Sequence, residues 1–240
     1  MQVNAHYYRQ FDADHSLEVP AEGYGGWSSA SIEVDPERTA LVVMHAWETG
    51  TPETYPGWWR AVEYMPRAQA ILRDVFPRLL GAVRCSRMRI FHVVGGGGYY
   101  RHLPGHALTR TIAGPAPNPP EGIAPDETLR RLRAFRSENV FVGKHNEADV
   151  ARGFAALDFP DEARPLDTEP IAENGHELYA LCKHYGVGHL IYAGFAVNWC
   201  LLLSPGGMHE MSSRGIMCSA IRQAVTAVEI ALYPIGPLQP

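Results

Sequence analysis

Five short, mostly apolar runs recur along the chain, separated by segments in which apolar residues have helical spacing. The runs lie at 40–44, 89–94, 140–142, 189–193 and 216–220. Such runs predict strands that are buried on both faces, as in a parallel sheet. Helical spacing predicts helices over roughly 66–83, 127–135, 173–185 and 223–233, and a further one after residue 198. Strands that alternate with helices predict an α/β fold, in which a central, mainly parallel sheet lies between two layers of helices.

Glycine, proline and polar residues set the predicted boundaries of these elements. Asp126 is predicted to cap the helix that follows it, and Gly186 to end the helix that precedes it. The sequence Ser204-Pro205-Gly-Gly predicts a break in the helix that begins near residue 198. We expect Ser204 to cap a second segment there and Pro205 to open it, because proline suits the first position of a helix.

The remaining segments define the predicted domain organisation. Residues 1–38 show no periodicity and are interpreted as an N-terminal arm, and residues 39–240 are predicted to form one domain. Segments 45–64 and 99–125 are rich in Gly, Pro, Trp or His and are predicted to be loops. Long loops in compact domains are usually functional, so the second of these is a candidate for binding residues.

The amino-acid composition argues against nucleic-acid-binding and membrane proteins. The chain has 240 residues, 46% of them hydrophobic, and a formal net charge of −5 with dispersed charges. This balance argues against a nucleic-acid partner or a membrane surface. No apolar run approaches the roughly 18 residues that a membrane span needs, and the first residues lack the apolar core of a signal peptide. We therefore expect a cytoplasmic protein. As separate expectations, the partner is a small-molecule substrate and no cofactor is predicted.

Four cysteines are spread along the chain without a Cys-x-x-Cys pair. This spacing fits neither a zinc finger nor a dense disulfide framework, so reduced thiols are expected. Cys85, Cys182 and Cys218 fall in or beside apolar stretches and are interpreted as core residues. Cys200 has a different context, which gives it a chemical interpretation.

Cys200 follows a predicted strand, the break at Gly194 and a potential N-cap at Asn198. It would therefore lie in the first turn of a helix, where the helix dipole and free backbone N–H groups favour an anion. Such an environment lowers the pKa of a thiol and makes the thiolate a nucleophile. The alternative interpretation is a buried structural cysteine, which the strand–glycine–turn–helix context makes less attractive.

Three predicted strands end at or lead to residues that could react. His45 follows the first strand, Lys144 follows the run at 140–142, and Cys200 follows the run at 189–193. In an open parallel sheet, sites form outside the carboxyl ends of the strands. These three distant positions are therefore predicted to meet in one crevice.

The same segments carry a family resemblance. Segments 39–45 (TALVVMH), 140–144 (VFVGK), 190–200 (LIYAGFAVNWC) and 214–227 resemble, in order and spacing, those of the isochorismatase-like cysteine hydrolases. This family includes nicotinamidases and N-carbamoyl amidases, and the resemblance covers roughly residues 38–230. It implies a three-layer α/β/α fold of Rossmann-like topology.

The resemblance also implies roles for particular residues. Cys200 would attack the carbonyl of a small amide or carbamoyl compound and form a thioester, with Lys144 supporting the developing charge. The backbone N–H groups of Ala196 and Cys200 would form the oxyanion hole. The turn would contain a cis peptide bond at Phe195–Ala196.

The first strand departs from the family pattern, because His45 stands where the family has an aspartate. A neutral imidazole can take a thiol proton and return it to a leaving group, so His45 is one candidate for the base. Glu48, three residues further on, is a second candidate. The other interpretation is that the base has been lost, and that the chain is a catalytically silent member that binds a small molecule or assembles with partners.

Aromatic and histidine residues complete the list of candidates. Trp47 and Tyr99 lie in loops after the first two strands and are predicted to contact the substrate. His92, His102 and His106 are interpreted as solvated loop histidines, so no metal site is predicted. The family resemblance and the aromatic-rich arm predict a homo-oligomer.

Overall fold

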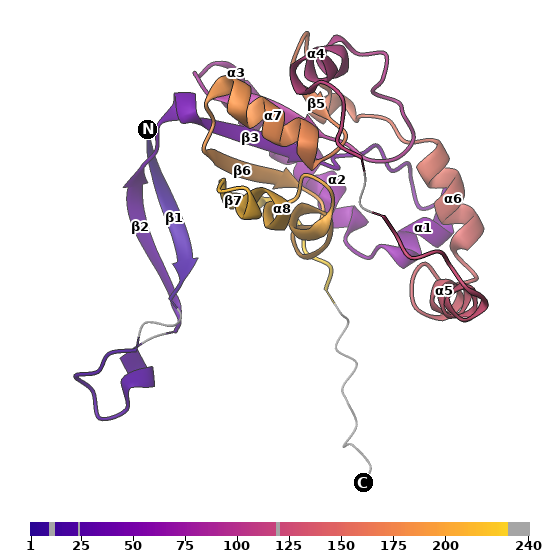
Figure 1. Ribbon diagram of the computed structural model, residues 1–240, viewed down its shortest axis with the longest axis horizontal. Helices are drawn as coiled ribbons and strands as arrows, with labels where there is room; N and C mark the ends of the chain where they lie inside the picture. Colours follow the sequence, from indigo (N-terminus) through magenta and orange to yellow (C-terminus); the bar gives the residue numbers. More distant parts are fainter. Residues whose placement is uncertain (10–12, 24, 119–120, 230–240) are drawn as a thin grey trace.

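The computed structural model describes residues 1–9, 13–23, 25–118 and 121–229 (Figure 1). Within them, a central sheet has five strands in the order β5-β4-β3-β6-β7, and every pairing in it is parallel. The strands are β3 (Thr39–Met44), β4 (Arg89–Val93), β5 (Ile171–Ala172), β6 (His189–Gly194) and β7 (Met217–Val225). All six residues of β3 are buried, as its unbroken apolar sequence requires.

Helices cover both faces of this sheet, which confirms the predicted three-layer α/β/α fold. On one face, α2 (Met65–Asp74) and α3 (Phe76–Arg84) pack through Leu72, Phe76 and Leu80 against Leu41 and Val43. On the other face, α7 (Gly175–Tyr185) and α8 (Met208–Ser213) contribute to the second core cluster. Alternate residues of β3 therefore supply two separate cores, because successive side chains of a strand point to opposite faces.

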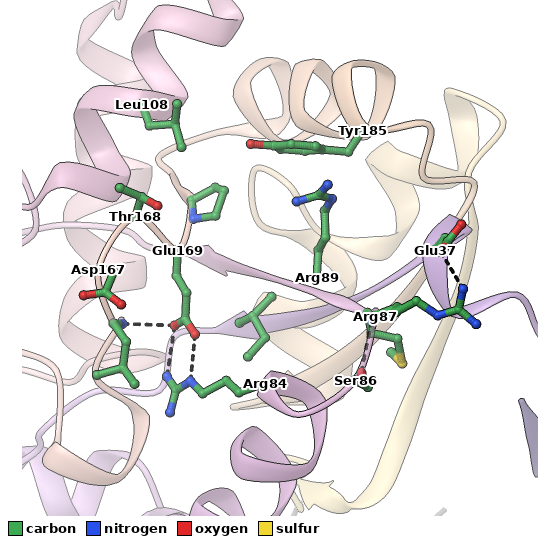
Figure 2. Close-up of a pocket in the computed structure, with 14 residues that line it drawn as sticks. Glu37, Arg84, Ser86, Arg87, Arg89, Leu108, Asp167, Thr168, Glu169 and Tyr185 are labelled. Atoms are coloured by element: carbon green, nitrogen blue, oxygen red, sulfur yellow. Dashed lines mark hydrogen bonds and ion pairs between the residues drawn. The ribbon is translucent and has the colours of Figure 1, made fainter.

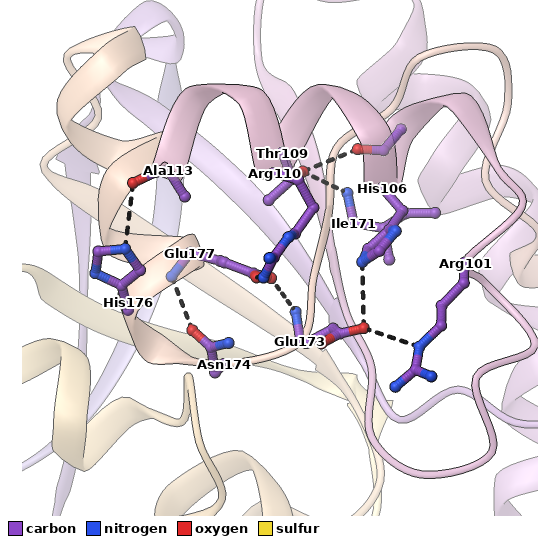
Figure 3. Close-up of polar contacts among 11 residues, drawn as sticks. Arg101, His106, Thr109, Arg110, Ala113, Ile171, Glu173, Asn174, His176 and Glu177 are labelled. Carbon is purple, nitrogen blue, oxygen red and sulfur yellow. Dashed lines mark hydrogen bonds and ion pairs between the residues drawn. The ribbon is translucent and has the colours of Figure 1, made fainter. Parts of the chain in front are cut away.

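Polar contacts attach α4 (Pro104–Ala113) to α7 and to the segment before it (Figure 3). The Asn174 side chain caps α7 by accepting a hydrogen bond from the Glu177 backbone. The Glu177 carboxylate is only 1% exposed, and it accepts hydrogen bonds from Arg110 at 3.1 Å and from the Glu173 backbone at 2.7 Å. A buried carboxylate needs such partners, so these contacts fix α4 beside α7.

A further group of helices lies at the end of the molecule opposite the N-terminal strands (Figure 1). It contains α1 (Pro56–Ala61), α5 (Glu127–Asn139) and α6 (Glu147–Ala155). Trp58 of α1 packs so closely on Gly153 of α6 that a Cβ at Gly153 would lie 2.1 Å from the indole ring. Glycine is therefore required for this helix contact. By contrast, α5 has no buried residue.

The N-terminal segment contains an antiparallel hairpin, although its sequence shows no periodicity. β1 (Gln2–Tyr8) pairs with β2 (Trp27–Glu33), and the 3-10 helix η1 (Pro20–Gly23) lies between them. A second 3-10 helix, η2 (Pro36–Arg38), leads into β3, and a third, η3 (Asp161–Ala163), precedes β5. The division into an arm of residues 1–38 and a domain of residues 39–240 stays a prediction.

Two predicted elements are wrong, the single helix predicted over roughly 66–83 is two helices, α2 and α3, and helices α1, α4 and α6 were not predicted. Residues 140–142 form no strand, because α5 continues to Asn139 and the chain then turns; the edge of the sheet is instead the two-residue strand β5. Residues 223–225 belong to β7, and 226–229 form no helix; residues 230–233 lie outside the described residues. Helices α1 and α4 occur in segments that were predicted as loops, each with a proline in its first turn.

The cysteine predictions also need one correction. Cys182 is buried in the core and Cys218 is half-buried, but Cys85 is exposed. Cys85 caps the carboxyl end of α3, where the helix leaves the core. Among the described residues, no helix combines the length and the apolar character that a membrane span requires.

Candidate active site at the carboxyl ends of the central strands

The order of the strands creates a switch point beside β3. From β3 the chain passes to β4 and β5 on one side, and it later returns to β6 on the other side. Ligands in open α/β sheets bind outside the carboxyl ends of the strands at such a point. Here Met44 is in register with Gly194, and the Phe195 backbone donates a hydrogen bond to the Met44 carbonyl at 3.3 Å. His45 follows β3 and Phe195 follows β6, so these two residues lie side by side.

Gly194 makes this close approach possible. Its φ is +132°, a conformation that favours glycine, and a Cβ there would lie 1.8 Å from the Met44 carbonyl oxygen. No other residue fits this position without moving one of the two central strands. The next peptide bond, Phe195–Ala196, is cis, as the family resemblance implies.

A cavity of about 150 Å³ lies at this switch point. Its walls come from the ends of β3 and β6, from α1 and α2, and from the segments that carry Phe141 and Phe154. The lining residues are His45, Trp47, Thr49, Trp58, Val62, Tyr64, Met65, Ala68, Leu72, Phe141, Phe154, Phe195, Trp199 and Cys200. None of these residues is Lys, Arg, Asp or Glu, so an imidazole and a thiol are the reactive groups in largely apolar surroundings.

His45 is held firmly in this wall. It is 8% exposed, and its ring stacks on Trp47 with the ring centroids 4.5 Å apart. Its Nδ1 atom is buried without a hydrogen-bond partner in the described part of the chain. Burial lowers the pKa of His45 to about 4, because a charged imidazole loses its hydration there. The ring is therefore neutral at pH 7, and the lowered pKa makes it a weak base.

Cys200 lies in the short π-helix η4 (Val197–Leu201) and is half-buried. Burial raises the pKa of its thiol, and hydrogen bonding with Ser204 and with the Ala196 backbone only partly offsets this. The expected lowering of this pKa is therefore wrong, because η4 provides one turn of helix while the cavity removes water from the sulfur. At pH 7 the group is a thiol that requires a base.

The local structure around Cys200 differs from the predicted one in two details. Ala196, not Asn198, is the N-cap of η4, and the Asn198 side chain instead forms two hydrogen bonds with the Val228 backbone, at 2.9 and 2.8 Å. The predicted break after residue 203 is confirmed. However, the second segment, α8, begins at Met208 with Gly207 as its N-cap, so Ser204 and Pro205 do not open it.

Of the predicted site residues, the structure brings His45, Trp47 and Cys200 together at the cavity. Lys144 does not line it, and is exposed in the turn that follows α5. Tyr99 does not line it either; its hydroxyl accepts a hydrogen bond from the Trp47 indole at 2.9 Å. Glu48 is exposed and accepts a hydrogen bond from the Gly50 backbone at 2.8 Å. Its side chain is thus outside the cavity.

Several cavity residues were not predicted from the sequence. Tyr64, Phe141, Phe195 and Trp199 contribute aromatic walls, and Phe141 packs edge-on against Trp199 at 5.1 Å. Phe195 and Trp199 flank the predicted nucleophile turn, which is a signal that could have identified them. Phe141 and Tyr64 depend on how distant segments fold back, and the sequence pattern carries no signal for that.

The interpretation of His92 and His106 as solvated loop residues is wrong, because His92 lies in β4 and His106 in α4, and each is close to a carboxylate. His92 is fully buried, and its Nε2 lies 3.0 Å from the Glu169 carboxylate, whereas His106 lies 3.2 Å from Glu173. Within the described residues, no group of three or more His, Cys, Asp or Glu side chains is arranged to hold a metal ion.

Comparisons with known proteins give distant structural similarities. No family model and no curated protein matches the chain. A cysteine hydrolase from Pseudomonas syringae pv. phaseolicola 1448A matches with 13% identity and a TM-score of 0.47, covering 85% of this chain and 79% of that one. An isochorismatase from Pseudomonas putida KT2440 matches with 16% identity and a TM-score of 0.42, covering 83% and 76%.

The N-carbamoylsarcosine amidase from Thermoplasma acidophilum matches with 15% identity and a TM-score of 0.40, covering 83% of this chain and 87% of that one. These proteins carry the names of the family that the sequence resembles. At such low identity the similarity assigns no role to any residue of this chain.

Proposed function

We propose that this protein hydrolyses small neutral amides or carbamoyl compounds, with Cys200 as the nucleophile and His45 as the base. One observation carries the proposal: His45 and Cys200 come from the ends of two adjacent strands and line the same apolar cavity. At pH 7 the lowered pKa of His45, about 4, leaves a neutral but weakly basic imidazole, and the raised pKa of Cys200 leaves a thiol, so the proposed proton transfer is uphill and has to be coupled to attack on the substrate carbonyl.

The size and character of the cavity support a specific class of substrate. An apolar cavity of about 150 Å³ accommodates a molecule of the size of benzene. No Lys, Arg, Asp or Glu lines the wall, so a charged substrate would lose its hydration without gaining a partner. The proposed substrate is therefore a neutral amide with a small apolar or aromatic body.

The proposed reaction runs in two stages. His45 takes the thiol proton, and the sulfur of Cys200 attacks the substrate carbonyl carbon to give a tetrahedral oxyanion. The backbone N–H groups of Ala196 and Cys200 are the proposed donors to this oxyanion. The C–N bond then breaks, His45 returns the proton to the departing amine, and water hydrolyses the thioester to a carboxylic acid and free Cys200. Since Ala196 already hydrogen-bonds with the thiol, its amide is close to the reacting atom.

Lys144 is not needed for proton transfer in this scheme. It remains a predicted catalytic residue, and its exposed position means that a direct role would require the turn after α5 to move toward the cavity. The Lys144→Ala variant separates the two cases. Unchanged kcat would remove Lys144 from the mechanism, whereas a loss of 100-fold or more, on the order of a general acid–base effect, would restore it.

The test is a hydrolysis screen with benzamide, small aliphatic amides and carbamoyl compounds, read by release of ammonia. Mass spectrometry after an acid quench should detect an acyl group on Cys200. We expect Cys200→Ser to abolish release and His45→Asn to lower kcat about 10²- to 10⁴-fold. The matched control is Cys218→Ser, a half-buried thiol on β7 that does not line the cavity. Release by Cys200→Ser at the wild-type rate would overturn the proposal.

A second candidate is a protein that binds a small apolar molecule without turnover. The raised pKa of Cys200 and the exposed position of Lys144 favour it. Quenching of tryptophan fluorescence by benzamide, with neither ammonia release nor an acyl adduct, would select this candidate. The His45→Asp variant adds a further arm, because hydrolysis gained in it would identify the natural protein as a silent relative.

We also propose that the protein is a homo-oligomer, because the hairpin of β1 and β2 exposes aromatic side chains. Trp27 is 72% exposed and Tyr8 is 51% exposed, and the two rings pack edge-on at 5.6 Å. An isolated two-stranded hairpin is at best marginally stable, so a neighbouring copy that covered it would add apolar contact. Light scattering should give a mass that is a multiple of 26.5 kDa. A monomer mass at micromolar concentration would contradict it.

A further inference from the structure

The amino ends of the strands open into a second hollow, a groove of about 850 Å³ (Figure 2). It lies at the opposite end of the sheet from Cys200, because Arg89 is the first residue of β4 and Pro170 directly precedes β5. The remaining walls come from the end of α3, from Leu108 of α4, from the 166–169 segment and from Tyr185, the last residue of α7. Nothing in the proposed hydrolysis uses this groove.

Two of the three arginines that line this groove are already neutralised. Arg84 donates two hydrogen bonds to the Glu169 carboxylate, at 2.7 and 2.9 Å, and Glu169 also contacts buried His92 at 3.0 Å. Arg87 forms an ion pair with Glu37 at 2.8 Å. These charges are therefore compensated within the protein, and Figure 2 shows both pairs among the lining residues.

Arg89 is the exception. Its guanidinium lies over the Tyr185 ring, 3.8 Å from the ring centroid, and Figure 2 shows the two groups together on one wall. In the described part of the chain it has no carboxylate partner. The other unpaired charge in the lining is Asp167, which Figure 2 places beyond Glu169, away from Arg89. The ring covers one face of the guanidinium, and Arg89 is an exposed residue of the groove lining.

The chemistry of the groove defines the ligand that would fit. A guanidinium held flat by an aromatic ring presents a planar fork of donors, which matches two oxygens of a carboxylate or of a phosphate. Because only one cation is uncompensated on that wall, the wall suits a single negative charge, which a carboxylate carries and a phosphate, at about −1.5 to −2 near pH 7, exceeds. Met88, Ile90, Leu108 and Pro170 give it apolar walls beside that charge. The ligand therefore needs an anionic head and an apolar body.

We infer that this groove is a binding site for a small organic carboxylate, held by the edge of the Arg89 guanidinium. The apolar body of the ligand lies against Leu108 and Pro170, and the Tyr185 and Thr168 hydroxyls line the same hollow. The site is separate from the Cys200 cavity, which contains no charged lining residue, and it stands whether or not the protein is a hydrolase.

The test uses benzoate as the probe in isothermal titration calorimetry. Benzamide serves as the neutral molecule of the same shape, and inorganic phosphate as a different anion. We expect benzoate to bind the wild type and to bind Arg89→Gln at least about 10-fold more weakly, as for a lost hydrogen bond to a charged group. Arg89→Lys keeps the charge without the planar fork and should fall between the two. Phosphate should bind more weakly than benzoate, and the affinity for benzamide, which is also a proposed ligand of the Cys200 cavity, should not change in Arg89→Gln.

Arg87→Gln is the matched control, since Arg87 lines the same groove but is paired with Glu37. We expect its benzoate affinity to stay within about threefold of the wild type. A second control, Trp199→Leu in the Cys200 cavity, should leave benzoate affinity unchanged. Equal binding by Arg89→Gln, binding lost in Trp199→Leu, or phosphate that binds more tightly than benzoate would each overturn the inference. No benzoate binding to the wild type at millimolar concentration would also overturn it.

Discussion

The two ends of one parallel sheet provide two different chemical environments. At the carboxyl ends, aromatic side chains enclose a cavity of about 150 Å³, in which burial lowers the pKa of His45 and raises that of Cys200. At the amino ends, a groove of about 850 Å³ is lined by ion pairs, and hydrogen bonds to Arg84 and His92 bring the pKa of Glu169 to about 2 against the opposing effect of burial. Exclusion of water favours neutral groups at one end, whereas charge pairing favours ions at the other.

The largest expected effect comes from a matched pair of glycines at the two ends of β6. Gly194→Ala would place a Cβ 1.8 Å from the Met44 carbonyl oxygen at a φ of +132°. We expect a loss of at least about 3 kcal/mol in the free energy of unfolding, or failure to fold. Gly188→Ala meets no atom within 4 Å at the other end of the strand and should change stability by less than about 0.5 kcal/mol. Urea denaturation measures both; equal effects would contradict the close approach at Gly194.

The second prediction concerns acid stability at the cavity end. The pKa of His45 in the folded protein, about 4, lies below the ordinary value of 6.5. Between these two pH values the imidazole is protonated in the unfolded chain but neutral in the folded protein. The free energy of unfolding should therefore fall as the pH drops from 6.5 to 4, by about 3 kcal/mol from this residue. His45→Asn removes this part of the slope.

Unfolding in urea at several pH values compares the variant with the wild type. The two curves of stability against pH should converge below pH 6.5 as acid removes the benefit of neutral His45. His45→Gln offers a second side chain without a titrating group and should behave in the same way. Curves that run parallel from pH 7 to pH 4 would show that the imidazole is hydrated in the folded protein.

The third prediction concerns Glu169 at the amino end of the sheet, whose contribution to stability changes over a lower pH range than that of His45. The folded pKa of Glu169, about 2, lies below its ordinary value of 4.5, so its stabilisation is present above pH 4.5 and is lost as the pH falls toward 2. Because this carboxylate is partly exposed, we expect Glu169→Gln to cost about 1–2 kcal/mol at pH 6. Glu37→Gln, in the exposed pair with Arg87, should cost less than about 0.5 kcal/mol. Urea unfolding of the wild type and Glu169→Gln at pH 6 and pH 3 tests this prediction. A destabilisation by Glu169→Gln that is as large at pH 3 as at pH 6 would contradict it.

The smallest expected effect concerns the support of His45. Tyr99→Phe removes the acceptor of the Trp47 indole N–H, whose ring stacks on His45. We expect a loss of about 1 kcal/mol, the usual net value of one neutral hydrogen bond. Tyr55→Phe, also in the aromatic cluster around Trp58, is the control. Equal stability of Tyr99→Phe and the wild type would mean that packing alone holds Trp47.

Sequence patterns predicted the centre of the fold better than its edges. β3, β4 and β6 are confirmed because their apolar runs are long enough to be buried on both faces. The run at 140–142 has three residues, too few to distinguish a strand from the end of a helix, and α5 continues to Asn139 just before it. The edge strand β5 has two residues and leaves almost no pattern to detect.

The candidate site follows the same division. The meeting of His45 and Cys200 was predictable, because it depends only on which strands end where in a parallel sheet. The direction of the pKa of Cys200 was not, since it depends on burial by aromatic residues from distant segments, such as Trp58 and Phe141. Lys144 was predicted to lie at the site because residues 140–142 were predicted to form a strand. That segment forms no strand, and Lys144 does not line the cavity.

The order of the strands also has a consequence for folding during synthesis. β3 and β4 are neighbours in the sheet and are made one after the other. The strand that pairs with the other edge of β3 is β6, which is made about 150 residues after β3. During that interval a fully buried strand, TALVVM, has one open edge, which is a template for aggregation. The site therefore assembles late, through contacts of high sequence separation, and those are the contacts that slow folding. An N-terminal fragment that stops before β6 contains His45 but lacks Phe195, Trp199 and Cys200 of the cavity wall.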